Sequence, residues 1–227
     1  DNLVIAVTGG FGSLGRATVD ALRAQGARVA VIDLAQAPEG SGGDHASLLL
    51  GGTDLSDADA ARACFERIVQ HYGRLDGLVN IAGGYRWTPV ADSDLDTWDF
   101  LQRINLRTTV SATLAALPHL AANGGAIVNI GAMGALSAGP GNGPYAASKA
   151  GVHKLTEALA AEQKDRGIRV NAVLPSIIDT PTNRADMPDA DHARWVAPAD
   201  IAAVIGFLLS PAAKAVTGAL IPVPGRV

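Results

Sequence analysis

A tyrosine and a lysine stand four positions apart in this chain of 227 residues, as Tyr145 and Lys149. Side chains with this spacing share one face of a helix. An ammonium group beside a phenol stabilises the phenolate, so it lowers a phenol pKa that is ordinarily about 10 and makes the group usable as an acid or a base. Taken alone, such a pair is more typical of a core tyrosine beside a solvated lysine, so its meaning depends on the rest of the chain.

A glycine-rich loop near the start of the chain carries a second kind of chemistry. Gly10, Gly12 and Gly15 satisfy G-x-G-x-x-G between an apolar run and a helical pattern, a context typical of backbone N–H groups that bind a pyrophosphate. Asp33 follows Gly15 by 18 residues and ends the next strand-like run. A carboxylate there accepts hydrogen bonds from ribose hydroxyls and repels a 2′-phosphate. Because Leu34 supplies no cation, the sequence predicts NADH rather than NADPH as cofactor.

The intervening sequence alternates between strand and helix patterns. Apolar or β-branched runs predict strands over 3–7, 28–33, 46–51, 75–82, 126–130, 168–174 and 219–223. Helical patterns cover 16–25, 57–72, 96–120, 145–166 and a segment that begins at 198. This alternation predicts an α/β fold, a single doubly wound Rossmann-type domain over 1–227, with a parallel sheet flanked by helices on both faces. Such sheets bind ligands beyond the carboxyl ends of their strands.

Composition excludes several classes of protein. Hydrophobic residues make up 48% of the chain and charged residues 18%, so it is not a disordered chain. The formal charge of −4 argues against a nucleic-acid partner. The uncharged stretch 108–148 is broken by Pro118 and several glycines and asparagines, so we expect no membrane span. The single cysteine, the absence of a visible signal peptide and the lack of metal-ligand spacing favour a cytoplasmic protein without a metal.

Taken together and in order, these motifs resemble the short-chain dehydrogenase/reductase family over essentially the whole chain. The matching stretches are the glycine loop 7–15, Asp33, the pair 54–55, the run 80–83, Asn105, the Tyr145/Lys149 pair, the run 171–175 and the run 216–219. The resemblance implies an NAD(H)-dependent oxidoreductase in which Tyr145 donates a proton, Lys149 tunes it and Asn105 holds a proton-relay water. It also implies that the cofactor contacts Gly9, Gly10, Phe11, Gly12, Leu14, Gly15, Asp33, Leu34, Asp54, Leu55, Asn80, Ala82, Gly83, Tyr145, Lys149, Pro175, Ile178 and Thr180.

Three positions depart from the family pattern. Ser13 stands where the glycine loop usually has Gly, and Ile81 replaces the second Asn of the usual N-N-A-G. The catalytic serine normally lies thirteen residues before the tyrosine, and that position is Ala132. Ser137 lies nearby as an alternative hydroxyl. A site without this serine is similar to the quinonoid dihydropteridine reductase branch, which the runs 10–15, 82–85, 139–141 and 172–195 also resemble, although Asn105 is not expected in that branch.

The leading prediction is therefore hydride transfer from NADH to a conjugated acceptor such as a quinonoid dihydropterin. Such an electron-poor ring needs less electrophilic help than a ketone, so one proton donor suffices. We expect the substrate to meet Ala132, Tyr85, Trp87 and Trp195.

Two alternatives remain open. One is a carbonyl reductase or secondary-alcohol dehydrogenase that works without the serine, and the other is an inactive NAD-binding sensor or scaffold. The family often assembles through its two long central helices, so a homodimer or homotetramer is expected, with a small molecule as substrate.

Overall fold

The structure is a computed structural model that describes residues 3–37, 47–120 and 124–227. Within these ranges the strands are β1 Val4–Thr8, β2 Arg28–Ile32, β3 Ser47–Leu50, β4 Gly77–Asn80, β5 Gly125–Ile130, β6 Ile168–Pro175 and β7 Leu220–Val223. They form one sheet in the order β3-β2-β1-β4-β5-β6-β7, and every neighbouring pair is parallel. The predicted α/β fold with a parallel sheet is confirmed.

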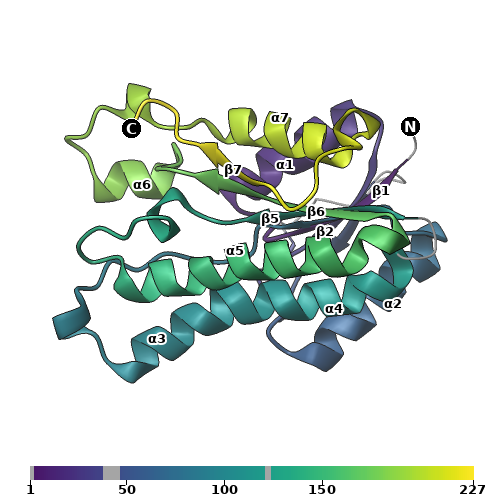
Figure 1. Cartoon of the computed structure of the whole chain (residues 1–227), viewed down its shortest axis with the longest axis horizontal. Coiled ribbons are helices and arrows are strands. Elements are labelled where there is room, and N and C mark those ends of the chain that lie inside the picture. Colours follow the sequence, from purple (N-terminus) through teal and green to yellow (C-terminus); the bar gives the residue numbers. More distant parts are fainter. Residues whose placement is uncertain (1–2, 38–46, 121–123) are drawn as a thin grey trace.

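Helices cover both faces of the sheet (Figure 1). The α-helices of the described residues are α1 Ser13–Ala24, α2 Ala58–Tyr72, α3 Leu95–Leu101, α4 Thr108–Leu120, α5 Gly143–Gln163, α6 Pro181–Asp186 and α7 Pro198–Leu209. A π-helical turn, η2 Gln102–Arg107, joins α3 to α4, and short 3₁₀ turns lie at Val90–Asp92, Met133–Ala135, Lys164–Arg166, His192–Arg194 and Pro211–Ala213. Helices α1 and α7 lie on one face, whereas α2, α4 and α5 lie on the other.

The two faces build two separate apolar cores because successive side chains of a strand point to opposite sides. In β1, Val4 and Ala6 join the core under α2, α4 and α5. Ile5 and Val7 join the core under α1 and α7. A strand that is buried on both faces reads as a continuous apolar run, which is why the sequence pattern located β1 so closely.

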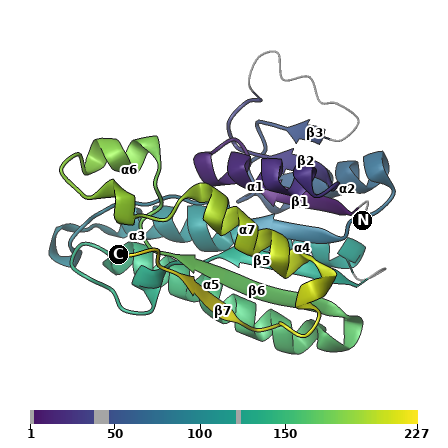
Figure 2. The ribbon, with the colours of Figure 1, turned by 90° about the horizontal axis from the view of Figure 1, so that it is seen from above.

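The strand order reverses at β1, and this is where the site lies. β2 pairs with one edge of β1 and β4 with the other. The Thr8 hydroxyl, at the end of β1, accepts hydrogen bonds from Ile81 N at 3.0 Å and Ala82 N at 3.1 Å. These bonds join the end of β1 to the loop that leaves β4. Figure 2 shows α6 beyond this carboxyl edge of the sheet.

Two helices differ from the sequence prediction. The segment predicted as one helix over 96–120 is α3, the π-helical turn η2 and α4 in succession. Helix α6 was not predicted, although Thr180 caps it by accepting a hydrogen bond from Asn183 N and Pro181 occupies its first position. The predicted strand 46–51 corresponds to β3, and its first position lies outside the described residues. No helix in the described part of the chain is both long and apolar enough to cross a membrane.

Candidate active site

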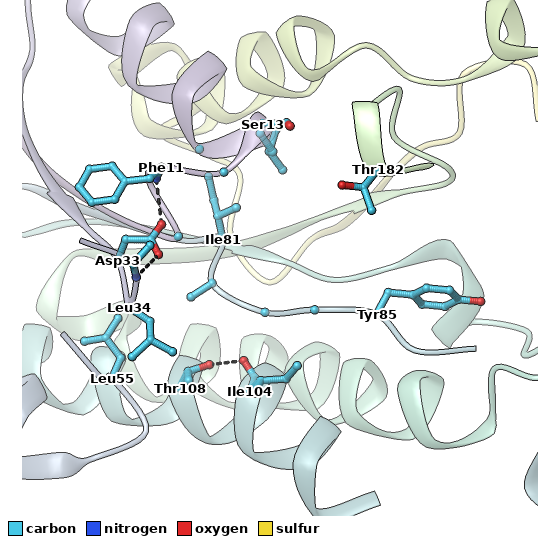
Figure 3. A pocket seen from close by; sticks show the side chains of 18 of the residues that line it. Phe11, Ser13, Asp33, Leu34, Leu55, Ile81, Tyr85, Ile104, Thr108 and Thr182 are labelled. Atoms are coloured by element: carbon cyan, nitrogen blue, oxygen red, sulfur yellow. Dashed lines mark hydrogen bonds between the residues drawn. The ribbon is translucent and has the colours of Figure 1, made fainter. Parts of the chain in front are cut away.

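A cavity of about 850 Å³ lies at the carboxyl edge of the sheet, between the glycine loop, the end of β2, the loop after β4 and α6 (Figure 3). The predicted residues that line it are Gly9, Phe11, Gly12, Leu14, Gly15, Asp33, Leu34, Asp54, Leu55, Ala82, Gly83, Tyr85 and Thr180. Ser13 and Thr182 face one another across it in Figure 3. The structure therefore brings the glycine loop near residue 10 together with α6, which lies about 170 residues later in the sequence.

The amino terminus of α1 offers the cavity a set of backbone donors. Gly12 is the N-cap residue, and no side chain caps the helix. Gly12 N donates to Gly9 O, and Arg16 N donates to Gly12 O, so the N–H groups of 13–15 are the unpaired ones of the first turn. That turn holds no acidic residue, and Arg16 also lines the cavity. Such a helix terminus favours a phosphate.

Close packing of the loop explains its glycines. A Cβ at Gly15 would overlap Gly9 O and the backbone of Gly10, and a Cβ at Gly9 would lie 2.8 Å from Ala82 N. The two glycines therefore allow the start of α1 to pack closely against the loop after β1 and the start of the 81–84 loop. Gly10 lies behind this surface, against the Val31 side chain, and does not line the cavity.

Asp33 closes the far end of the cavity beside Leu34 (Figure 3). Its carboxylate accepts hydrogen bonds from Phe11 N at 2.9 Å and from Ala35 N at 3.0 Å. A carboxylate has about four acceptor positions, so two remain for ribose hydroxyls. Asp54 is an exposed wall residue, and its hydrogen bonds from Ser56 hold the pKa of the carboxyl below its usual value.

The unpaired N–H groups at the helix terminus, the Asp33 carboxylate with its free acceptor positions and the cavity that both line fit a dinucleotide. Among the described residues, no group of three His, Cys, Asp or Glu side chains is placed to hold a metal ion.

Tyr145 lies on the first turn of α5, at the edge of the cavity rather than in its wall. The ring of Tyr85, which does line the cavity, packs edge-on against it, with ring centroids 4.9 Å apart. Burial raises the pKa of the Tyr145 phenol to about 12, and Tyr85 adds to the increase. The predicted lowering of this pKa by Lys149 is not found, because burial and Tyr85 both raise the pKa and Lys149 is not among its causes. At neutral pH the phenol therefore holds its proton.

Lys149 lies one turn further along α5 and is buried. Its Nζ donates a hydrogen bond to Ile130 O at 2.8 Å, and a Cβ at Gly83 would lie 3.5 Å from the same nitrogen. Burial lowers the pKa of the ammonium to about 8, so it is still mostly charged at neutral pH. The ammonium has three donor hydrogens, so two remain beside Gly83, in the cavity wall.

Asn105 lies fully buried in the π-helical turn η2. Its Oδ1 accepts from Gly84 N at 2.9 Å, and its Nδ2 donates to Gly84 O at 3.1 Å and to Ser148 Oγ at 3.0 Å. The Ser148 hydroxyl in turn donates to Tyr145 O at 2.7 Å. The amide is thus committed to fixing the loop at Gly84 to α5. Neither amide hydrogen is left for the predicted relay water, and the binding of such a water at another atom of Asn105 stays a prediction.

Ala132 follows β5 and is buried, with an extended backbone at the start of a 3₁₀ turn. It brings no hydroxyl to the site. Ser137 is exposed beyond that turn, so it does not stand in the position of Ala132.

The predicted aromatic wall is only partly present. Tyr85 lines the cavity, and its hydroxyl donates to Asn142 Oδ1 at 3.0 Å. Trp87 is 60% exposed and lies against Gly141, outside the cavity lining. Trp195 is buried, with its ring centroid 4.4 Å from that of His192, and it does not line this cavity. Its contact with the substrate stays a prediction.

Three predicted cofactor contacts also lie elsewhere. Asn80 is buried under the sheet and donates to Thr113 Oγ1 and Asn129 Oδ1. Pro175 is buried at the end of β6, and Ile178 pairs with Val196 in an isolated bridge. None of the three lines the cavity. The sequence reading missed wall residues that share no motif, namely Ser13, Arg16, Ala35, Gln36, Thr53, Ser56, Ile81, Gly84, Arg103, Ile104, Thr108, Thr182, Asn183 and Asp186.

Comparisons with known proteins agree with this geometry. A family model described as enoyl-(acyl carrier protein) reductase matches residues 10–225. The D-threitol dehydrogenase of Mycolicibacterium smegmatis is 35% identical over an alignment of 240 positions, which covers 99% of this chain and 92% of that protein. The 3-oxoacyl-[acyl-carrier-protein] reductase of Thermotoga maritima is 33% identical over 237 residues, covering 98% of this chain and 96% of that protein.

A solved structure is similar over nearly the whole fold. The crystal structure of 3-ketoacyl-(acyl-carrier-protein) reductase from Brucella melitensis, complexed with NADH, has a TM-score of 0.86 and 27% identity. The match covers 99% of this chain and 98% of that one.

Proposed function

The chain belongs to the short-chain dehydrogenase/reductase family of oxidoreductases, and from that premise we propose that it is an NAD(H)-dependent carbonyl reductase or secondary-alcohol dehydrogenase. One observation carries the proposal: the protonated Tyr145 phenol stands beside the cavity on the same helix face as the buried Lys149 ammonium. The named chemistry of the relatives, a polyol dehydrogenase and two ketoacyl reductases, supports it.

Cofactor binding and proton transfer would involve different residues. The N–H groups of 13–15 would hold the pyrophosphate, and Asp33 the adenosine ribose. The bound nicotinamide supplies or accepts the hydride. During reduction Tyr145 gives its proton to the carbonyl oxygen, and the Lys149 ammonium stabilises the phenolate that is left.

A second candidate is supported by Ala132. Removing one hydrogen-bond donor to a developing oxyanion costs about 3 kcal/mol where the substrate depends on it. A quinonoid dihydropterin depends on it less, because its conjugated ring already accepts hydride readily. None of the relatives described above is named a dihydropteridine reductase, so this substrate ranks second. Comparing kcat/KM for ketones and for quinonoid dihydropterin separates the two.

Ala132→Ser is expected to raise kcat/KM for simple ketones by about tenfold, since a hydroxyl there adds part of the missing stabilisation. The measurement is steady-state NADH oxidation with a ketone series. Ser137→Ala is the matched control and should change nothing, because Ser137 is exposed. An unchanged ketone rate in Ala132→Ser would show that the carbonyl does not bind next to this position.

Asp33→Asn should lower the preference for NADH over NADPH by about tenfold. Asparagine keeps one oxygen that can accept from a backbone N–H, but it removes the charge that repels a 2′-phosphate. A charge–charge interaction in this partly exposed site is worth about 1–2 kcal/mol, and about 1.4 kcal/mol is a factor of ten. The readout is the ratio of kcat/KM values for the two cofactors. If that ratio does not move, the ribose is recognised elsewhere.

We also propose that the chain assembles as a homodimer or homotetramer through α4 and α5. Leu114 of α4 is 63% exposed, which favours a covered surface on that helix. Light scattering on Leu114→Glu and on the unmodified chain tests this, and a monomeric unmodified chain would contradict it.

A further inference from the structure

His153 is the third member of a column on α5. It follows Lys149 by four residues, as Lys149 follows Tyr145, so the three side chains share one helix face. The imidazole is only 3% exposed. Neither the cofactor cradle nor the proton transfer derived above uses it. His153 is therefore a buried titratable residue on the same helix face as two catalytic residues, and it has no function in the mechanism described above.

The ring binds the backbone where the family's serine would stand. Ala132 N donates a hydrogen bond to His153 Nε2 at 3.2 Å. The two preceding residues are also held, because Ile130 O accepts from Lys149 Nζ at 2.8 Å and Gly131 N donates to Val173 O at 2.9 Å. The segment 130–132 is thus fixed at three successive residues, two of them by side chains of the column on α5.

Gly131 shows how close the ring approaches. A Cβ on Gly131 would overlap His153 Nε2, would lie 2.7 Å from Cδ2 and would press on a Leu174 methyl group. Any other residue at 131 would displace the imidazole or the strand end. The glycine and the histidine therefore fit one another, and the fit aligns Ala132 against the ring nitrogen.

The hydrogen bond requires a neutral ring. Nε2 accepts a hydrogen bond from Ala132 N, so the ring hydrogen must be on Nδ1. Burial lowers the pKa of His153, the charge of Lys149 lowers it further and Lys154 adds to this, while Glu157 acts in the opposite direction. From the sheet side the ring meets Gly131 and Leu174, which do not titrate. Protonation would place a hydrogen on Nε2 against the Ala132 amide and a second positive charge beside Lys149.

We propose that neutral His153 is a positioning residue that fixes the backbone at Ala132, the position where the family's serine would stand and where this chain has no hydroxyl. The ring replaces no proton donor. It keeps the segment 130–132 and the Lys149 side chain in fixed positions, so that the single proton donor Tyr145 meets a correctly placed substrate. Only the kinetic part of the test below rests on the proposed function.

The kinetic test compares His153→Gln with His153→Leu. Gln Oε1 reaches the place of Nε2 and accepts from Ala132 N without titrating, whereas Leu fills the space and leaves the amide unpaired. We expect His153→Leu to lower kcat about tenfold with the KM for NADH unchanged within about twofold. His153→Gln should keep kcat within about threefold. Wild-type kcat should fall as the pH drops through the lowered pKa of the ring, and His153→Gln should lose that fall. His119→Gln removes another histidine, on α4, and should leave the pH profile unchanged.

A second measurement does not depend on any substrate. Nitrogen-15 spectra of the intact protein should show His153 with its hydrogen on Nδ1 at neutral pH, and the Ala132 amide should exchange faster in His153→Leu but not in His153→Gln. A charged ring at neutral pH, a hydrogen on Nε2, or a His153→Leu variant with wild-type kcat and pH profile would each overturn the proposal. A chain that reduces no carbonyl would contradict the proposed function alone, while the spectra and the amide exchange would still decide the role of His153.

Discussion

Tyr145→Phe is expected to cut kcat by about 100-fold or more and to leave the affinity for NADH within about twofold. The Tyr145 phenol is the acid that shares a helix face with the Lys149 ammonium, and Phe keeps the ring that packs edge-on against Tyr85. Binding and chemistry therefore separate in this variant. Cofactor affinity is measured by NADH fluorescence and turnover by NADH oxidation.

Tyr85→Phe is the matched control for that experiment. It removes a hydroxyl that donates to Asn142 Oδ1 and keeps the aromatic contact with Tyr145. We expect a loss of less than about tenfold, because the Tyr145 proton is still available. If Tyr145→Phe remained as active as the wild type, Tyr145 would have no place in the mechanism.

Gly15→Ala is expected to weaken NADH binding by about 100-fold and to lower the midpoint of thermal unfolding. The added Cβ would overlap Gly9 O and Gly10, and these are backbone atoms that cannot rotate away. Overpacking of this kind costs about 1–3 kcal/mol, and displacement of α1 would also misplace the N–H groups of 13–15. Calorimetric titration with NADH and a thermal melt give both quantities.

Gly12→Ala controls for the stability part of this prediction. The closest atom to a Cβ at Gly12 is Gly9 O at 3.5 Å, an ordinary contact, so its unfolding midpoint should stay close to that of the wild type. A Gly15→Ala variant that melted and bound NADH like the wild type would show that the loop does not need this close approach.

The sheet was predictable because its strands are buried on both faces and read as unbroken apolar runs, as β1 does with Val4 to Val7. The π-helical turn at 102–107 was not, since one inserted residue leaves the helical pattern of 96–120 almost unchanged. Helix α6 had a readable signal in Thr180 and Pro181, a capping residue followed by proline at the first position. The helix was not predicted because its six residues are too few to show a helical pattern.

Some residues of the site could likewise be predicted from the sequence, and others could not. Motif residues such as Gly15, Asp33 and Gly83 lie in the cavity wall because the strand–loop–helix order alone places them there. Asn80 does not, because its side chain points under the sheet toward Thr113, and the motif cannot show on which face a strand-end residue projects. Thr182 and Arg103 come from segments that only tertiary packing brings to the cavity.

We propose that this chain moves a hydride between NAD(H) and a carbonyl or secondary alcohol, with Tyr145 as the proton donor and no catalytic serine. The most direct measurement is NADH oxidation by the wild type and by Tyr145→Phe, with a panel of simple ketones and quinonoid dihydropterin in parallel. We predict that at least one ketone is reduced by the wild type and that this rate falls about 100-fold or more in Tyr145→Phe. NADH that binds but is oxidised by no ketone, or by the pterin alone, would contradict the claim.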